Sequence, residues 1–317
     1  MKRFISNYGG IIAGALYGLC MRLFFDRPSS SFFTDLFSVT FELVLPVLIG
    51  IIPIMFASKE QLSSMRYYVG RPIYAVLLFF IVCYVTDLED IICILIISIP
   101  FTPIAAISGI LFARIIRNYK EKKGYMFSLI LLPLFTGVAE KQFDTPSNTY
   151  TINTSVITNA APDKIWEHVV RVKPIKETEY DKGFFNYAGI PRPLYAELNR
   201  DTIGSTRTGY FEGGLVFTET VTHWERNKEV SFDIQVVPSS IRQTVFDKHI
   251  LQGGHFKFLN ASYRLTKINS RQTELILSSS YQLDSKVNAY GSFWGNKLLV
   301  DFQGRLLEVI KDRCEEI

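Results

Sequence analysis

The distribution of apolar residues in this 317-residue chain changes abruptly near residue 140. Before that point, long apolar runs are separated by short charged loops, whereas after it apolar and polar residues alternate in short segments. Long apolar runs favour membrane-spanning helices, and alternation favours strands with one buried and one solvated face. We therefore expect two domains, a helical one over residues 1–140 and a second one over residues 150–317.

Five apolar runs make up the first part of the chain, and they differ in length. They cover residues 4–25, 37–57, 72–85, 91–115 and 125–138. A transmembrane helix needs about 17 to 20 predominantly apolar residues. The first, second and fourth runs meet this requirement, whereas the third and fifth are marginal. The sequence therefore predicts an all-α transmembrane bundle of four to five spans over residues 1–140.

Basic residues are concentrated in alternate loops, and this predicts an orientation in the membrane. Two basic residues, Lys2 and Arg3, precede the first run. The loop after the second run contains Lys59, Arg66 and Arg71, and the loop after the fourth run contains Arg114, Arg117, Lys120, Lys122 and Lys123. The remaining loops contain only Arg27 or, at residues 87–90, no basic residue. The positive-inside rule then places the N-terminus in the cytoplasm. Five crossings place the C-terminal domain outside the cytoplasm, whereas that domain is cytoplasmic if residues 125–138 do not cross.

Two features inside the apolar runs concern helix packing. Gly10, Gly14 and Gly18 recur at four-residue spacing, which lets another helix approach closely. Arg22 and Glu42 are charged residues at the adjoining ends of the first two runs and are therefore placed to pair with each other. The alternative for these two charges is an ion or proton pathway.

The second domain begins after a polar tether at residues 141–149. A strand pattern starts at Tyr150, and Pro162 suits the first turn of a short helix. Strand patterns then cover residues 195–198, 205–212, 215–224, 229–238, 255–268 and 273–283. Gly213 and Gly214 indicate a hairpin, and a long amphipathic helix starts near Asn288. Because helices and strands are segregated, we expect an α+β fold with an antiparallel sheet.

Several of these segments resemble the START-like or SRPBCC superfamily, in particular its polyketide cyclase/dehydrase-like branch. They are INTSVITNAAPDKIWEHVV, GIPRP, IGSTRTGYFEGGLVFTETVTHWERNKEVSFDI and the C-terminal helix. The resemblance covers residues 150–317 and implies a helix-grip fold, in which a curved sheet wraps a long helix and encloses a deep apolar cavity. It does not imply one activity, because this superfamily contains carriers, cyclases, hydroxylase subunits and sensors.

Candidate ligand-binding residues follow from the alternation in neighbouring strands. Arg207 and Phe211 share one face of their strand, and Phe217 and Glu219 share one face of the next. If these faces point inward, the two charged residues are polar anchors in an apolar cavity; the alternative is a cross-strand ion pair exposed to solvent. Phe232 and Trp224 are further candidates, for which core packing is the alternative.

No residue pattern predicts catalysis, a cofactor or a metal. His168, His223, His249 and His255 are scattered, and only Cys314 of the four cysteines lies in the second domain. The sequence favours a membrane-anchored protein whose second domain binds a lipid or another hydrophobic small molecule. The alternatives are an enzyme of the cyclase or hydrolase kind and a membrane sensor or assembly module. Nucleic acid is not an expected partner because basic residues do not cluster in the second domain, and no protein partner is indicated.

Overall fold

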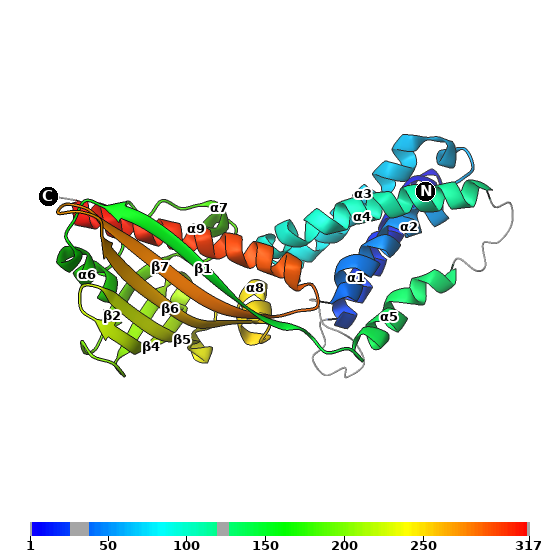
Figure 1. The fold of residues 1–317 in the computed structure, drawn as a ribbon. Helices are drawn as coiled ribbons and strands as arrows, with labels where there is room; N and C mark the ends of the chain where they lie inside the picture. The colour runs from blue at the N-terminus through cyan, green and yellow to red at the C-terminus, as the bar shows by residue number, and fades with distance from the viewer. Residues whose placement is uncertain (1, 26–37, 119–126, 316–317) are drawn as a thin grey trace. The chain divides into compact units, whose positions relative to one another are not determined.

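The computed structural model describes residues 2–25, 38–118 and 127–315. The chain divides into two compact units. The helical unit contains Met1–Thr145 with Ser285–Val287, and the sheet unit contains Pro146–Asp284 with Asn288–Ile317 (Figure 1).

The helical unit contains five α-helices among its described residues. They are α1 (Lys2–Phe25), α2 (Leu45–Met55), α3 (Met65–Val85), α4 (Ile91–Asn118) and α5 (Leu132–Glu140). The π-helical turn η1 (Thr40–Val44) leads into α2, and the 3₁₀ turns η2 (Gln61–Ser63) and η3 (Phe127–Leu131) precede α3 and α5. Within the described part of this unit, three segments are long and apolar enough to cross a membrane, namely Tyr8–Phe25, Met65–Val85 and Ile91–Arg117.

The lengths of two helices differ from the sequence expectation. The run at residues 37–57 forms a shorter apolar helix, Thr40–Met55, while the run at residues 72–85 belongs to the full-length span Met65–Val85. The helix α3 is longer than the apolar run because it starts seven positions before Pro72, in a stretch whose polar residues interrupt the apolar pattern. In this stretch the Arg71 guanidinium carbon lies 4.9 Å from the centroid of the Tyr67 ring. Arg27, Lys120, Lys122, Lys123 and Tyr125 lie outside the described residues.

Glycines allow the helices of this unit to approach one another closely, as the spacing in the first run predicts. A Cβ atom added to Gly10 would lie 2.9 Å from the Pro53 backbone, and one added to Gly18 would lie 2.9 Å from the Phe79 ring. The closest approach is at Gly50 of α2, where an added Cβ would lie 2.2 Å from the carbonyl oxygen of Ala105 in α4.

The expected pairing of Arg22 with Glu42 is wrong. The Arg22 Nε atom donates a hydrogen bond of 2.6 Å to Glu89 Oε1, and Nη2 donates one of 2.8 Å to the Leu88 carbonyl oxygen. Both acceptors lie in the turn between α3 and α4, which the sequence pattern does not place beside the end of α1. Glu42 is buried as well.

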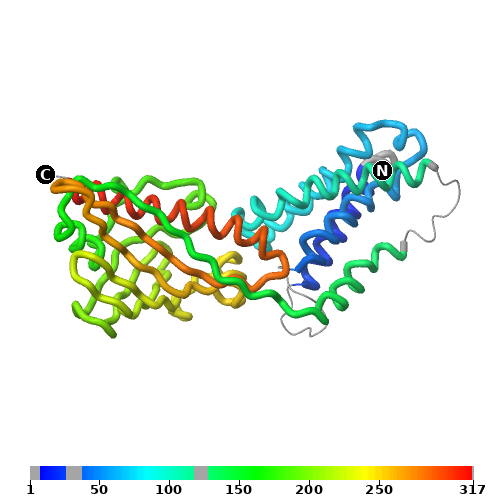
Figure 2. Tube along the Cα trace, viewed as in Figure 1, coloured from blue at the N-terminus to red at the C-terminus, as the bar shows by residue number. Residues whose placement is uncertain are grey.

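The sheet unit contains one seven-stranded sheet in the order β1-β7-β6-β5-β4-β3-β2, with every neighbouring pair antiparallel. The strands are β1 (Ser147–Thr158), β2 (Pro193–Leu198), β3 (Thr206–Phe211), β4 (Val216–Glu225), β5 (Glu229–Val236), β6 (Phe256–Lys267) and β7 (Thr273–Asp284). β1 therefore includes the last three residues of the expected tether. Figure 2 shows β1 running beside β7, although the two strands are far apart in the sequence.

Two longer helices complete the sheet unit, α6 (Pro162–Val170) and the C-terminal α9 (Asn288–Glu315). The single-turn helices α7 (Phe184–Tyr187) and α8 (Val245–Asp247) lie in connections, as do the short turns Glu212–Gly214, Pro238–Ser240 and Lys248–Gln252. Gly213 and Gly214 have φ values of 76° and 84°, which explains the glycine pair in the β3–β4 hairpin. An antiparallel sheet that grips one long helix is the fold class expected from the sequence, and it is confirmed.

Candidate ligand-binding site

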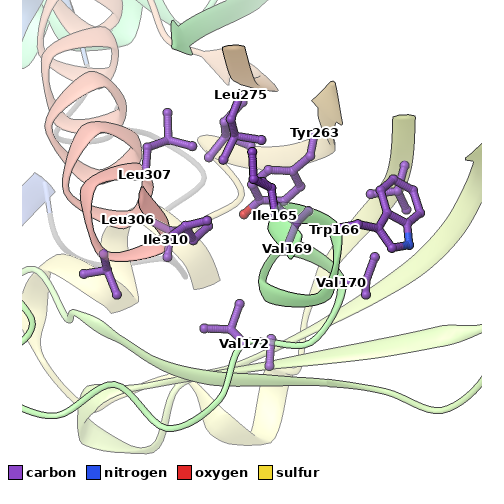
Figure 3. Packing of buried hydrophobic residues seen from close by; sticks show 14 of the residues in the cluster. Ile165, Trp166, Val169, Val170, Val172, Tyr263, Leu275, Leu306, Leu307 and Ile310 are labelled. Carbon is purple, nitrogen blue, oxygen red and sulfur yellow. The ribbon is translucent and has the colours of Figure 1, made fainter. Parts of the chain in front are cut away.

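The inner face of the sheet, which α9 covers, has two halves that differ in packing. In one half, side chains from the sheet, α6 and the C-terminal part of α9 form a closed core. Figure 3 shows Tyr263 and Leu275 meeting Ile165 and Val169 of α6 and Ile310 of α9, and all five are buried. We call this region the packed half.

In the other half, aromatic rings form a chain across the inner face of the sheet. It consists of Phe211 (β3), Phe217 (β4), Phe258 and Phe256 (β6), Tyr281 (β7) and Tyr150 (β1), and we call it the aromatic row. Successive ring centroids lie 4.6, 5.1, 4.9, 4.7 and 5.3 Å apart. Phe217 and Tyr281 are buried, whereas the other four rings are only half-buried.

The position of α9 explains why the aromatic row is incompletely covered. A Cβ atom added to Gly291 would lie 2.9 Å from the Leu283 side chain, and one added to Gly295 would lie 2.9 Å from the Tyr281 hydroxyl. These glycines let the first half of α9 pack closely on β7, beside β1 (Figure 1). Ile234, Val236 and Phe258, on the inner face of the middle strands, consequently remain half-buried.

Polar side chains of α9 face the sheet between the two halves. Gln303 is fully buried; its Oε1 accepts a hydrogen bond of 2.7 Å from Thr154, and its Nε2 donates one of 2.9 Å to Ser279. The Tyr281 hydroxyl donates a hydrogen bond of 2.6 Å to Asn296 Oδ1, and burial raises the pKa of Tyr281 to about 12. The tyrosine is therefore a neutral donor at ordinary pH.

Arg207 and Glu219 face inward and form an ion pair in which the side chains are only 5% and 10% exposed, which excludes the solvent-exposed alternative. Arg207 also donates from Nε to the Val170 carbonyl oxygen at 3.1 Å and from Nη2 to that of Val169 at 3.3 Å. These two carbonyls are the last of α6, so the arginine joins the C-terminal end of this helix to β3 and β4. Its three nitrogen atoms thus all have acceptors.

The surroundings of Arg207 keep its guanidinium group charged. Burial alone would lower the pKa of Arg207, but the Glu219 carboxylate reverses the effect and the pKa lies above its ordinary value. The hydroxyl of Tyr263 lies beside the pair, and burial raises the pKa of Tyr263 to about 12. The Phe232 ring lies 5.1 Å from the guanidinium carbon of Arg207. This arrangement is typical of a structural ion pair that is satisfied by its own chain.

The structure thus separates the six candidate residues into two groups. Phe211 and Phe217 belong to the aromatic row, whereas Arg207, Glu219, Phe232 and Trp224 lie toward the packed half. Trp224 packs edge-on against Trp166, with ring centroids 5.1 Å apart. The sequence reading missed Tyr150, Tyr281 and Asn296, although alternation along β1 and β7 could have indicated the first two. Whether any of the six contacts a ligand stays a prediction.

Metal-ligand side chains do not gather in groups of three or more within residues 2–25, 38–118 and 127–315. Of the histidines, His255 places its Nδ1 atom 3.1 Å from the Asp284 carbonyl oxygen. His168 lies in α6, where burial and then the charge of Arg313 lower its pKa. Neither of these two histidines belongs to the aromatic row.

The chain matches no family model and no curated protein. Among the solved structures that match, a START superfamily protein from Mycobacterium smegmatis shares 12% identity at a TM-score of 0.36, over 52% of this chain and 97% of its own. The Zhui aromatase/cyclase from Streptomyces shares 11% sequence identity at a TM-score of 0.33, and the match covers 53% of this chain and 94% of the cyclase. A truncated norcoclaurine synthase from Thalictrum flavum shares 10% sequence identity at a TM-score of 0.34, and the match covers 55% of this chain and 99% of the synthase. Because these sequence identities and TM-scores are low, functional conclusions depend on the site itself.

Proposed function

We propose that the sheet unit binds a lipid or another hydrophobic small molecule against the aromatic row, and that the helical unit anchors it to a bilayer. The observation that carries the proposal is the set of half-buried rings on the inner face of the sheet. Apolar area left open to water costs about 25 cal/mol per Å² relative to burial. A hydrophobic guest would recover this free energy without any change in the fold.

Binding has more support than acid–base catalysis. An enzyme of the cyclase or hydrolase kind needs a titratable pair that reaches its substrate. Arg207 and Glu219, the charged pair on the inner face, are bonded to each other and to α6. The six members of the aromatic row are phenylalanines and tyrosines, and they supply apolar area with hydroxyl groups at one end only.

Filling the space beside the aromatic row is expected to block binding. Val236 lies opposite Phe217 on the inner face, whereas Gln235 is exposed on the outer face of the same strand. The full chain in lipid nanodiscs should bind the neutral fluorescent probe N-phenylnaphthylamine more than empty nanodiscs do. Val236→Phe should weaken this binding about tenfold, because the larger side chain occupies the space of the guest and overpacking costs about 1–3 kcal/mol when the guest binds.

The matched control for this experiment is Gln235→Phe, which adds the same ring on the opposite face and should leave probe binding unchanged. Equal loss in both variants, or no binding above that of empty nanodiscs by the unmodified chain, would contradict the proposed function.

We propose further that the chain is an integral membrane protein with a cytoplasmic N-terminus and a sheet unit outside the cytoplasm. The proposal uses the three candidate spans together with the shorter apolar helices Thr40–Met55 and Ser128–Glu140 as additional crossings. Lys59, Arg66, Arg71, Arg114 and Arg117 then lie on the cytoplasmic side, as the positive-inside rule requires.

A reporter fused to the C-terminus tests this orientation. We expect alkaline phosphatase, which is active only outside the cytoplasm, to be active there, and green fluorescent protein to be dark when exported through the same route. The fusion should be made to the full chain. The reverse pattern of activities would show that residues 125–138 do not cross and that the sheet unit faces the cytoplasm.

A further inference from the structure

Three properties of the aromatic row, namely its shape, its mostly apolar surroundings and the free amide donor beside it, restrict the kind of molecule that it can bind. Neighbouring rings meet at interplanar angles from 15° to 75°, and Phe211 also lies 6.1 Å from Phe302 of α9. Aromatic surfaces pack well on other rings, in stacked or edge-on arrangements. Flat, rigid guests suit such a surface, because they lose little conformational entropy on binding.

The side chains around the aromatic row are apolar except at its Phe211 end, where the Glu219 carboxylate lies on the same face and is already paired with Arg207. Its inner-face neighbours are Ile152, Ile234, Val236, Leu283 and Leu299. Two charged side chains of α9, Asp301 and Arg305, pair with each other at 2.9 Å, and Arg305 donates a further hydrogen bond to the Asp181 carbonyl oxygen. A carboxylate or phosphate placed against the aromatic row would lose its hydration without gaining a counter-ion, which is costly.

An amide hydrogen-bond donor beside the aromatic row has no partner in the described part of the chain. Asn296 lies on the sheet-facing side of α9, together with Ser292, Leu299 and Gln303, which are buried. Its Oδ1 atom accepts the hydrogen bond from the Tyr281 hydroxyl, and this fixes the amide. The Nδ2 atom, which carries two hydrogens, donates to no group among the described residues, and the side chain is half-buried.

We infer that the guest is an uncharged molecule with flat rings and a carbonyl or hydroxyl oxygen, which accepts a hydrogen bond from the Asn296 amide. This inference rests on the proposed function and specifies its ligand class. The rings of the guest lie against Phe256 and Phe258, next to Tyr281 in the aromatic row. The Tyr281 hydroxyl holds the amide in place, so Asn296 sets specificity and the aromatic row supplies affinity.

Three tricyclic probes of the same shape test the inference. They are fluorene, which has no acceptor, fluorenone, which has one carbonyl, and fluorene carboxylate, which is charged. Binding is measured to the full chain in lipid nanodiscs, and the amount taken up by empty nanodiscs is subtracted. We expect fluorenone to bind about five- to tenfold more tightly than fluorene, the effect of one hydrogen bond, and fluorene carboxylate to bind most weakly.

Asn296→Leu keeps the size of the side chain and removes its donor. In this variant fluorenone should bind no better than fluorene, while fluorene binding is retained, which shows that the fold is intact. Asn260→Leu is the matched control, because Asn260 is exposed on β6 and its replacement should preserve the preference for fluorenone.

The possible failures are distinguishable. If none of the probes binds above the level of empty nanodiscs, the proposed function itself is wrong. If fluorene binds as tightly as fluorenone, if the carboxylate binds best, or if the preference survives in Asn296→Leu, the proposed function stands and this inference is overturned.

Discussion

Replacing Arg207 with methionine should lower the free energy of unfolding of the sheet unit by about 3–5 kcal/mol. The replacement leaves the Glu219 carboxylate, which is 10% exposed, without its counter-ion. It also removes the donors to the Val169 and Val170 carbonyls at the end of α6. Urea unfolding of the full chain in mild detergent measures this loss through tryptophan fluorescence, because Trp166, Trp224 and Trp294 all lie in the sheet unit.

Arg171→Met is the matched control, since Arg171 has the same kind of contacts at the surface. It pairs with Asp201 at 2.5 Å and donates to the Leu198 carbonyl oxygen at 3.2 Å, but its side chain is 44% exposed. We expect a loss of about 1 kcal/mol or less. An equally small loss for Arg207→Met, together with weaker binding of N-phenylnaphthylamine, would instead support Arg207 as a ligand anchor.

Adding one methyl group at Gly50 should disrupt the helical unit. The new Cβ atom would lie 2.2 Å from the Ala105 carbonyl oxygen and 2.3 Å from the Ser108 hydroxyl, so α2 and α4 must separate. Because backbone cannot rotate away as a side chain can, we expect Gly50→Ala to cost about 3 kcal/mol, the upper end of overpacking effects. Separation of the helices would also strain the hydrogen bond of 3.1 Å from Ser108 to the Val47 carbonyl oxygen.

A fluorogenic maleimide can follow this unfolding through Cys83, which is buried in the helical unit, in a background where the other three cysteines are alanine. Gly70→Ala is the control, because the nearest atom to its added Cβ would be a Tyr74 ring carbon at 3.6 Å. The melting temperature should fall for Gly50→Ala and stay within error for Gly70→Ala. Equal melting temperatures would show that α2 and α4 are not in close contact.

The strands of the sheet unit could be predicted from the sequence because one face of each is buried. The pattern at residues 273–283, for example, corresponds to β7 (Thr273–Asp284), whose alternate side chains are buried. Gly213 and Gly214 likewise indicated the hairpin that their positive φ values require. Such features depend on neighbours in the sequence, and short-range patterns are sufficient to find them.

The incomplete covering of the aromatic row could not be predicted in this way. It depends on how closely Gly291 and Gly295 let α9 approach Leu283 and Tyr281, which is a property of packing between separate elements. The partner of Arg22 was missed for the same reason, because Glu89 reaches it through the turn between α3 and α4. Alternation identified the inward-facing side chains, but the packing of α9 decides which of them stay accessible.

The pairing of β1 with β7 also has a consequence for biosynthesis. Ser147 of β1 pairs with Asp284 of β7, so the first strand has no strand partner until β7 has left the ribosome. At about 5–20 residues per second, translation leaves the edge of β1 open for on the order of ten seconds. During that interval the preceding apolar helices have already been synthesised, and the sheet is complete only when β7 pairs with β1.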